Sequence, residues 1–224
     1  DAGNPQQIVV NGLPDITATA NNAPVICNDG TTDITLDTDI AGTEFSWTVN
    51  DGGGISWVGG KAPVAGTITD GGGTEKIIQN LQHTMTSPVS VDYVITSEGP
   101  GTSACTGNSV TKTVVVEPTI EVTASGETIC EGGTTNIDVE TVFSGNNGQE
   151  YTWTVAAPAD VTGWSDGPAD GQAFDVNITQ TLNNSATTPQ TVTYTITGYT
   201  TDGSGNLLCA GTPLDVDVIV EPDI

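Results

Sequence analysis

Basic side chains are almost absent from this sequence. Lys and Arg together number 3 among 224 residues, against 28 Asp plus Glu, and the formal net charge is -25. Because so few cationic groups are available to displace counterions, the chain cannot compete for phosphate backbones or anionic lipid headgroups. Apolar runs of about 18 residues, which a membrane-spanning helix needs, are absent as well. The composition therefore excludes nucleic acid as a partner and predicts no membrane insertion.

The acidic charge is least balanced in the C-terminal half. Residues 118–224 hold 15 Asp plus Glu and neither Lys nor Arg. Salt bridges from Lys or Arg to these acidic residues therefore cannot hold this half together. Charge of one sign is typical of disordered chains, but Val, Ile and Leu recur here at strand spacing and four Trp are present. We therefore expect a folded chain. Its acidity would keep an extended extracellular array soluble, stretch it by self-repulsion, or recruit divalent cations.

A long internal repeat organises the sequence. The pattern Ile-Cys-x-x-Gly-Thr-Thr-x-Ile occurs twice, as does aromatic-x-Trp-Thr-Val, and a Val-rich segment ending in Glu-Pro returns 104 residues after Glu117, at Glu221. Repeats that cannot fold alone are about 20–50 residues long, so each copy is predicted to be a whole domain. We assign residues 1–13 to the tail of a preceding repeat or a linker, 14–117 to the first repeat and 118–224 to the second. The chain is interpreted as a two-domain excerpt from a longer array.

Short alternating segments predict β-strands throughout both repeats. Residues 34–36, 45–49, 91–95 and 111–116 alternate apolar side chains with Thr, Ser or Asp, which is the period of a half-buried strand. Gly-rich turn sequences such as residues 51–54 separate them, and no sustained helical period is present. We predict an all-β chain of two tandem immunoglobulin-like antiparallel β-sandwich domains. The short connection at residues 117–120 predicts a rod-like array.

Four aromatic residues at matching positions are expected to organise the two sandwiches. Trp47 and Trp153 lie on a predicted central strand and should fill the space between the sheets. Tyr93 and Tyr194 lie where a late strand could make a tyrosine-corner-like contact. Unlike in antibody domains, no Cys follows these Tyr residues by two positions. Any disulfide should therefore tie strand ends rather than the centre of a sandwich.

The four cysteines also occupy matching positions, Cys27 and Cys105 in the first repeat and Cys130 and Cys209 in the second. Four cysteines allow three connectivities. A domain that folds alone would carry its own bridge, so the repeat favours Cys27–Cys105 and Cys130–Cys209, each contributing about 4 kcal/mol. Pairing of Cys105 with Cys130 across the junction, and free thiols, are the rival readings. Paired cysteines indicate an oxidising, extracytoplasmic compartment, and the lack of Cys-x-x-Cys disfavours a metal site.

The combination of repeated motifs resembles the PKD-like repeats of very large secreted proteins of Bacteroidetes. The motifs are Ile-Cys-x-x-Gly-Thr-Thr-x-Ile, aromatic-x-Trp-Thr-Val, Tyr-x-Ile-Thr, Cys-x-Gly and the Val-rich strand ending in Glu-Pro, and together they cover both repeats. The resemblance implies immunoglobulin-like sandwiches exported to the cell surface by type IX secretion. The acidic, Thr-rich composition is similar to that of the giant mobile adhesins of gliding flavobacteria, which implies a filament for cell adhesion and gliding motility.

Two features that could indicate catalysis are better explained without it. Residues 163–167 fit the Gly-x-Ser-x-Gly nucleophile elbow, but that motif needs a strand-to-helix turn and a His base, and the second repeat has no His. The single His of the chain, His83, has no neighbouring Cys or His and is predicted to be a surface or loop residue. We therefore predict no catalytic residues and no enzyme activity.

Calcium is the one cofactor that the sequence leaves open. Asp37 and Asp39 resemble the opening of a calcium loop, whose hard oxygen ligands suit the ion. The loop lacks a ligand at its fifth position and a bidentate acid at its twelfth, where Thr48 stands, so a polar hairpin turn is favoured. A separate hypothesis places calcium at the domain junction, bound by Glu117 and loop acids of the neighbouring repeat.

Two further tryptophans keep a binding role open. Trp57 and Trp164 follow turn-like sequence, where an exposed indole could stack on a sugar, although their recurrence favours a core position. The expected function is a non-catalytic, disulfide-stapled stalk of a long surface adhesin, with neighbouring repeats of the same chain as partners. The alternatives are a module that binds extracellular polysaccharide and an accessory sandwich of a secreted hydrolase.

Overall fold

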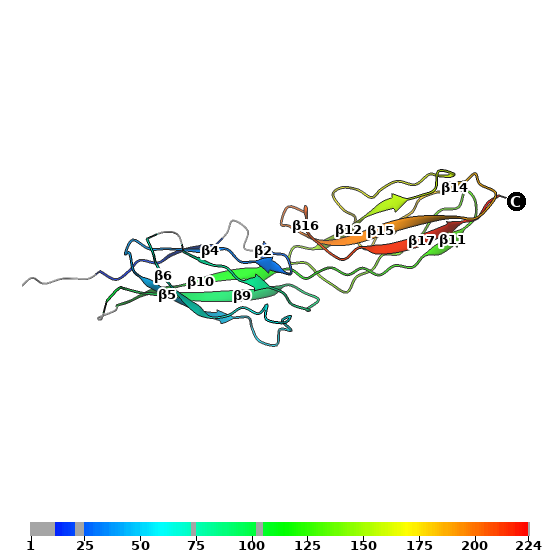
Figure 1. Ribbon diagram of the computed structural model, residues 1–224. Coiled ribbons are helices and arrows are strands. Elements are labelled where there is room, and N and C mark those ends of the chain that lie inside the picture. Colours follow the sequence, from blue (N-terminus) through cyan, green and yellow to red (C-terminus); the bar gives the residue numbers. More distant parts are fainter. Residues whose placement is uncertain (1–11, 21–24, 73–74, 102–104, 224) are drawn as a thin grey trace, which may run out of the picture.

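Two β-sandwich units follow one another along an elongated molecule (Figure 1). The computed structural model describes residues 12–20, 25–72, 75–101 and 105–223. Within these ranges the chain forms seventeen strands and no helix, and therefore no helix able to span a bilayer. The prediction of an all-β chain with two tandem immunoglobulin-like sandwiches is confirmed. Of the segment assigned to a preceding tail, residues 1–11 lie outside the described residues.

The first unit packs a three-stranded sheet on a five-stranded sheet. The smaller sheet has the order β1 (Thr17–Ala20), β4 (Ile34–Asp37), β7 (Glu75–Ile77). The larger has the order β2 (Val25–Ile26), β10 (Thr106–Val116), β9 (Val89–Glu98), β5 (Glu44–Asn50), β6 (Gly66–Thr69). A short ribbon pairs β3 (Gly30–Thr31) with β8 (Asn80–Leu81). Neighbouring strands are antiparallel except β2, which runs parallel to the end of β10.

The second unit repeats this plan with fewer regular strands. Its main sheet has the order β11 (Glu127–Ile129), β17 (Leu214–Val220), β15 (Gln190–Thr201), β12 (Gln149–Ala156), and β16 (Leu207–Ala210) pairs with β15. A ribbon joins β13 (Val161–Thr162) to β14 (Asn183–Asn184), and the facing layer is held by single bridges such as that between Ile137 and Ile178. As in the first unit, the only parallel pair of the main sheet, β11 with β17, lies at its edge.

Strand alternation builds one core in each unit. Inward residues of β9 and β15 are buried while their neighbours are more exposed, which is the pattern expected of a sheet with one face on a core. Trp153 is 6% exposed and fills the second core as predicted. Trp47 is only half-buried at the margin of the first core, packed over Gly66 with its indole N–H on the carbonyl of Val64 at 2.9 Å. Trp47 therefore packs against the first core as expected but fills it less completely than Trp153 fills the second, since it stays partly exposed at the edge strand β6.

A polar triad of a buried tyrosine, a buried threonine and a partly buried glutamine recurs at the same place in both units. In the first unit, the hydroxyl of Tyr93 donates to Gln79 Oε1 at 3.0 Å, and the N–H of Gln79 donates to Thr32 Oγ1 at 2.9 Å. The second unit has the same triad in Tyr194, Gln180 and Thr135, at 2.9 Å and 2.8 Å. Burial raises the pKa of each tyrosine to about 12, so both stay protonated donors. The tyrosine corner that was expected is thus replaced by a bond to a glutamine side chain.

Candidate functional site: the junction between the two units

A disulfide joins the two units. It links Cys27 to Cys209, whose Cα atoms lie 5.4 Å apart and which are 182 residues apart in sequence. Sequence reasoning favoured one bridge inside each unit and named Cys105 with Cys130 as the rival across the junction. The Cys27–Cys209 bond contradicts the two bridges inside the units. The rival bridge is contradicted separately, because Cys130 takes part in no disulfide.

Strand direction explains why a bridge within the first unit is wrong. Cys27 follows β2, whose Ile26 pairs with Val116 at the end of β10, whereas Cys105 precedes Thr106 at the start of β10. A strand of 11 residues separates these two points by roughly 35 Å at about 3.3 Å per residue, while a disulfide needs Cα atoms about 4.4–6.8 Å apart. The two cysteines of the first unit therefore lie at its opposite ends.

The same polarity holds in the second unit. Cys130 follows Ile129, which pairs with Val220 at the far end of β17, while Cys209 lies on β16 beside the other end of β15. Cys209 consequently faces the first unit, and Cys130 lies at the end of the second unit that points away from it. Cys105 and Cys130 lie at the two outer ends of the described pair of units, which is why the rival pairing is wrong as well.

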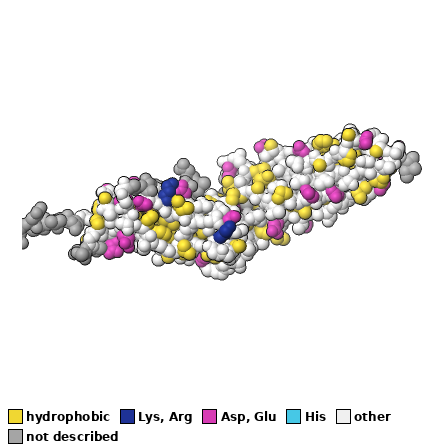
Figure 2. All heavy atoms as spheres, in the orientation of Figure 1, with side chains coloured by type: hydrophobic (Ala, Val, Ile, Leu, Met, Phe, Trp, Pro, Cys, Tyr) yellow, Lys and Arg dark blue, Asp and Glu magenta, His cyan; other side chains and the backbone are white. Residues whose placement is uncertain are grey.

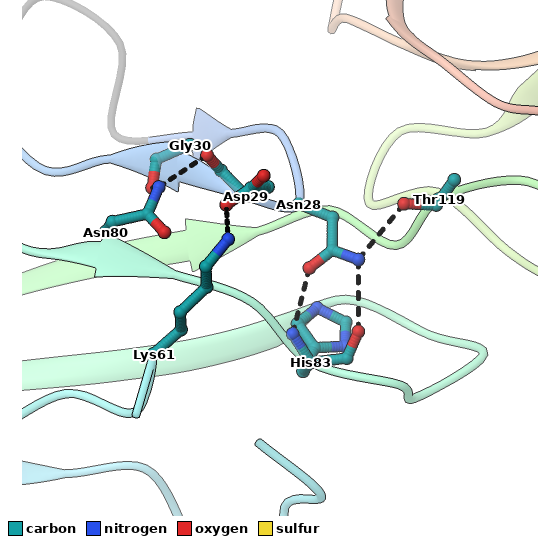
Figure 3. Close-up of polar contacts among 7 residues, drawn as sticks. All are labelled: Asn28, Asp29, Gly30, Lys61, Asn80, His83 and Thr119. Carbon is teal, nitrogen blue, oxygen red and sulfur yellow. Dashed lines mark hydrogen bonds and ion pairs between the residues drawn. The ribbon is translucent and has the colours of Figure 1, made fainter. Parts of the chain in front are cut away.

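A tight turn holds Cys27 in place at the junction. The N–H of Gly30 donates to the carbonyl of Cys27 at 2.8 Å, and a Cβ at Gly30 would lie 2.6 Å from that oxygen. Asp29 has a φ of 65°, the only non-glycine residue of the described ranges in the left-handed region. Its carboxylate pairs with Lys61, and the hydrogen bond from Lys61 lowers the pKa of Asp29 (Figure 3). The turn thus presents the Cys27 side chain in a fixed direction.

Asn28, the next residue of this turn, reaches across to the second unit. Its Oδ1 accepts the N–H of His83 at 2.9 Å, and its Nδ2 donates to the carbonyl of His83 at 3.0 Å. The same Nδ2 donates to Thr119 Oγ1 at 3.0 Å, just after the chain crosses between the units (Figure 3). The amide therefore ties the turn that carries Cys27 to the linking segment.

His83 is buried at the junction, 2% exposed, so its prediction as a surface or loop residue is wrong. Its Nδ1 accepts the N–H of Met85 at 3.1 Å, which leaves Nε2–H to donate to the carbonyl of Val116 at 3.1 Å. Burial lowers the pKa of His83, and the Val116 hydrogen bond opposes this only in part. His83 is thus a neutral structural imidazole. Sequence reasoning missed it because both partners are backbone groups.

Acid should weaken the junction through His83. Its pKa in the folded state lies below the unfolded value of about 6.5, so between these values the unfolded chain binds a proton that the native chain does not. The contribution of His83 to stability is complete above about pH 6.5 and is lost as the pH falls. We expect His83→Asn to remove this dependence, because Asn184 at the matching position bonds Val220 and Ala186 in the same way, at 2.9 Å each.

Urea unfolding of wild type and His83→Asn between pH 5 and pH 7.5 measures this effect. Glu121, which lines the same hollow as His83, and Glu117, which follows the Val116 that His83 bonds, are present in both proteins, so the difference between the two curves isolates the imidazole. The stability of wild type should fall relative to the variant as the pH drops. Parallel curves would contradict the assignment of a neutral, buried His83.

Glu117 is the second buried titratable group of the junction. It is 0% exposed, and both carboxylate oxygens accept the N–H of Asn146, at 3.2 Å and 3.0 Å. Burial raises the pKa of Glu117, and the Asn146 hydrogen bond lowers it to a smaller extent. A further backbone bond, from Ser144 N–H to the carbonyl of Thr86 at 2.9 Å, crosses the junction beside it. Glu117 therefore serves to seat a loop of the second unit.

The calcium candidates are not brought together. Asp37 and Asp39 line a surface hollow with Asp15 at the outer end of the first unit, whereas Glu117 lies at the junction end. Asp37 Oδ1 accepts the N–H of Thr38 at 2.9 Å, as in a polar turn. Across the described ranges, no three His, Cys, Asp or Glu residues are grouped as metal ligands. Calcium binding stays a prediction without a defined site.

The two tryptophans with an open role differ in exposure. Trp57 packs against the first core, with its ring edge toward His83 at 6.0 Å between centroids and its N–H on Asp51 Oδ2 at 2.7 Å. Trp164 is 40% exposed and bonds only the carbonyl of Val161, at 3.2 Å, so the core interpretation is wrong for Trp164. Ser165 of the elbow-like sequence accepts Gln180 Nε2 at 3.1 Å and lies in no strand-to-helix turn.

Comparison with known proteins matches both units to one family. A sequence profile described as a PKD-like domain matches residues 24–120 and again residues 127–224. A search of curated proteins gives no match. Among solved structures, the chain is similar to fibronectin(III)-like modules of Clostridium thermocellum CbhA, at 10% identity and TM-score 0.33, over 92% of this chain and 95% of that one. It is also similar to a collagen adhesin of S. aureus, at 8% identity and TM-score 0.22, over 92% of both chains.

Proposed function

The chain belongs to the PKD-like domain family, and we propose that its two units form a non-catalytic, rigid spacer within a long extracellular adhesin filament. The observation that carries this proposal is the Cys27–Cys209 bond across the junction. A single peptide connection lets two domains rotate about it, whereas a second covalent link removes most of that freedom. Two sandwiches tied twice behave as one stiff segment.

Hydrogen bonds at the junction act in the same direction. Asn28 holds Thr119, Glu117 holds Asn146, and Thr86 holds Ser144, and each of these contacts joins the first unit or its exit to the second. Scattered acidic side chains outnumber basic ones on the face shown in Figure 2, in line with 28 Asp plus Glu against 3 Lys plus Arg in the chain. A net charge of -25 opposes collapse of such segments on one another and favours an extended filament.

The disulfide also supports an extracellular location, because such bonds persist in oxidising compartments. In this role the two units transmit position and force, and contact with a surface or with polysaccharide occurs elsewhere in the filament. The resemblance of the repeats to those of mobile surface adhesins extends the proposal to adhesion during gliding motility.

Small-angle X-ray scattering tests the stiff spacer. Without reductant, the protein should scatter as a single elongated particle. Its maximum dimension should not change when the salt concentration is raised. The double variant Cys27→Ser with Cys209→Ser should show a broader distribution of distances, because only the peptide link and the hydrogen bonds remain. Cys130→Ser, which alters an exposed cysteine outside the bridge, serves as the matched control. A flexible wild-type protein would overturn the proposal.

The exposure of Trp164 favours one second candidate, recognition of polysaccharide by stacking on its indole. If this is correct, immobilised polysaccharides should bind the chain saturably, and Trp164→Ala should weaken binding by at least about tenfold, as expected for a lost aromatic contact. Trp164→Phe keeps a flat ring and should bind nearly as wild type. Binding that survives Trp164→Ala, or no binding by wild type, would contradict this candidate and leave the spacer role.

A further inference from the structure

Cys130 has, at the outer end of the second unit, the surroundings that Cys27 has at the junction. Each cysteine opens a turn in which a glycine N–H, from Gly30 or Gly133, donates to the cysteine carbonyl at 2.8 Å. A Cβ on either glycine would lie 2.6 Å or 2.7 Å from that oxygen, so both turns are equally tight. Each cysteine also follows a short strand that runs parallel to the last strand of its unit. The two side chains are therefore presented in the same way.

The polar contacts around the two cysteines match as well. Glu117 N–H donates to the carbonyl of Ile26 at 2.8 Å, and Glu221 N–H donates to that of Ile129 at 2.9 Å. Asn28 accepts the N–H of His83, and its counterpart Glu131 accepts the N–H of Asn184. The second unit lies beside Cys27, and an equivalent place for a further domain exists beside Cys130. Cys130 is exposed and takes no part in a disulfide.

The other half of such a bridge also recurs. Cys105-Thr106-Gly107 in the first unit matches Cys209-Ala210-Gly211 in the second. Both glycines lie against the segment that enters their unit: a Cβ on Gly107 would lie 2.8 Å from the carbonyl oxygen of Pro14, and one on Gly211 would collide with that of Ile120. Cys105 therefore marks the entry end of the first unit, where Cys209 marks that of the second.

We propose that Cys130 forms a disulfide with a second copy of the domain, through the cysteine that this copy carries at the Cys209 position. In a second copy of this chain that cysteine is Cys105. The inference rests on the proposed spacer role, which it deepens by naming the partner and the bond. Repetition of this bond head to tail would bridge every junction of an array, so that tension is carried by two covalent links at each step.

The chemistry is a thiol–disulfide exchange. Two thiols, of Cys130 and of the partner's Cys105, are oxidised to one disulfide, and a low-molecular-weight disulfide such as oxidised glutathione takes up the two electrons and two protons as two thiols. Separate copies repel each other at a net charge of -25 each. Salt at about 0.5 M shortens the Debye length to roughly 4 Å and permits their approach.

A complementary pair of variants tests the bond. Cys105→Ser retains the exit cysteine Cys130, and Cys130→Ser retains the entry cysteine Cys105. Each purified protein, and their equimolar mixture, is incubated in a glutathione redox buffer with about 0.5 M NaCl and analysed by non-reducing electrophoresis. The mixture should yield at least tenfold more disulfide-linked dimer than either variant alone, and wild type should yield a ladder. Mass mapping after digestion at Glu should join the Cys130 peptide to the Cys105 peptide.

Three results would overturn the inference. They are a mixture that gives no more dimer than the single variants, a Cys105→Ser protein that dimerises equally well through two Cys130 residues, and wild type that stays monomeric. Circular dichroism of each variant shows that it is folded. Scattering of the wild-type monomer tests the spacer role separately, so a stiff monomer without head-to-tail linkage would refute the bond to a second copy and leave the spacer standing.

Discussion

The chain with Cys27→Ser and Cys209→Ser is expected to lose about 4–5 kcal/mol of unfolding free energy relative to the oxidised wild type, according to the chain-entropy account of disulfides. The reason is the size of the loop. The bond closes 182 residues and spans nearly all of both units, so it restricts the unfolded ensemble of the whole chain. Bridges confined to single units would each have closed a loop less than half as long.

Urea unfolding followed by tryptophan fluorescence measures this loss, since each unit carries two tryptophans. In wild type the two units should unfold in one coupled transition, and in the double variant the transition should move to lower urea and separate into two. Cys130→Ser is the control and should stay within about 0.5 kcal/mol of wild type, as is usual for exposed substitutions. If Cys130→Ser were as damaging as the double variant, the bridge would involve the pairing within the second unit instead.

The architecture could be predicted from the sequence because it depends on local patterns that the chain states twice. Alternation on β9 and β15 marks the buried faces, and the recurrence of Tyr93 as Tyr194 marks one core position. Such patterns report which side of a strand is buried. They do not report which end of a domain a residue occupies, and the junction depends on that.

The pairing of the cysteines shows this limit most clearly. The repeat places Cys27 and Cys105 in one unit, and a self-sufficient domain argues for joining them. The parallel pairing of β2 with the end of β10 puts Cys27 at the exit of the unit, and Cys105 precedes the start of β10 at its entry. The sequence did contain a signal for this. Cys105 directly precedes the long last strand of the first unit, so it must lie the length of that strand away from the strand's end.

Buried polar residues with backbone partners were also beyond sequence reasoning. His83 bonds Val116 and Met85 through main-chain atoms, and Glu117 holds the N–H of Asn146, so no pair of side chains marks either contact in the sequence. The match between His83 and Asn184 was the available clue. Histidine and asparagine can each donate one hydrogen bond and accept another. Their occurrence at the same repeat position indicates a structural hydrogen-bonding site rather than a surface histidine.

Gly211→Ala is expected to destabilise the second unit by about 3 kcal/mol or more, a large effect for a single methyl group. A Cβ at this position would collide with the carbonyl oxygen of Ile120 and lie 2.8 Å from its carbonyl carbon and 3.0 Å from the oxygen of Gly198. All three atoms belong to the backbone and cannot move aside as a flexible side chain would. The Gly211 N–H also donates to the Gly198 carbonyl at 2.7 Å, so the strand cannot retreat without losing that bond.

The position of Gly211 carries this clash into the junction. Ile120 is fully buried as the first core residue after the chain crosses between units, and Cys209 lies two residues before Gly211. Displacing either segment pulls the disulfide away from Cys27, so the Cys27–Cys209 bond should become easier to reduce in Gly211→Ala. Gly203→Ala is the matched control, because nothing lies within 4 Å of its added Cβ. Thermal unfolding of both variants, with and without reductant, measures the difference in stability. Equal stability of the two variants would mean that Ile120 and Gly211 are not packed backbone to backbone.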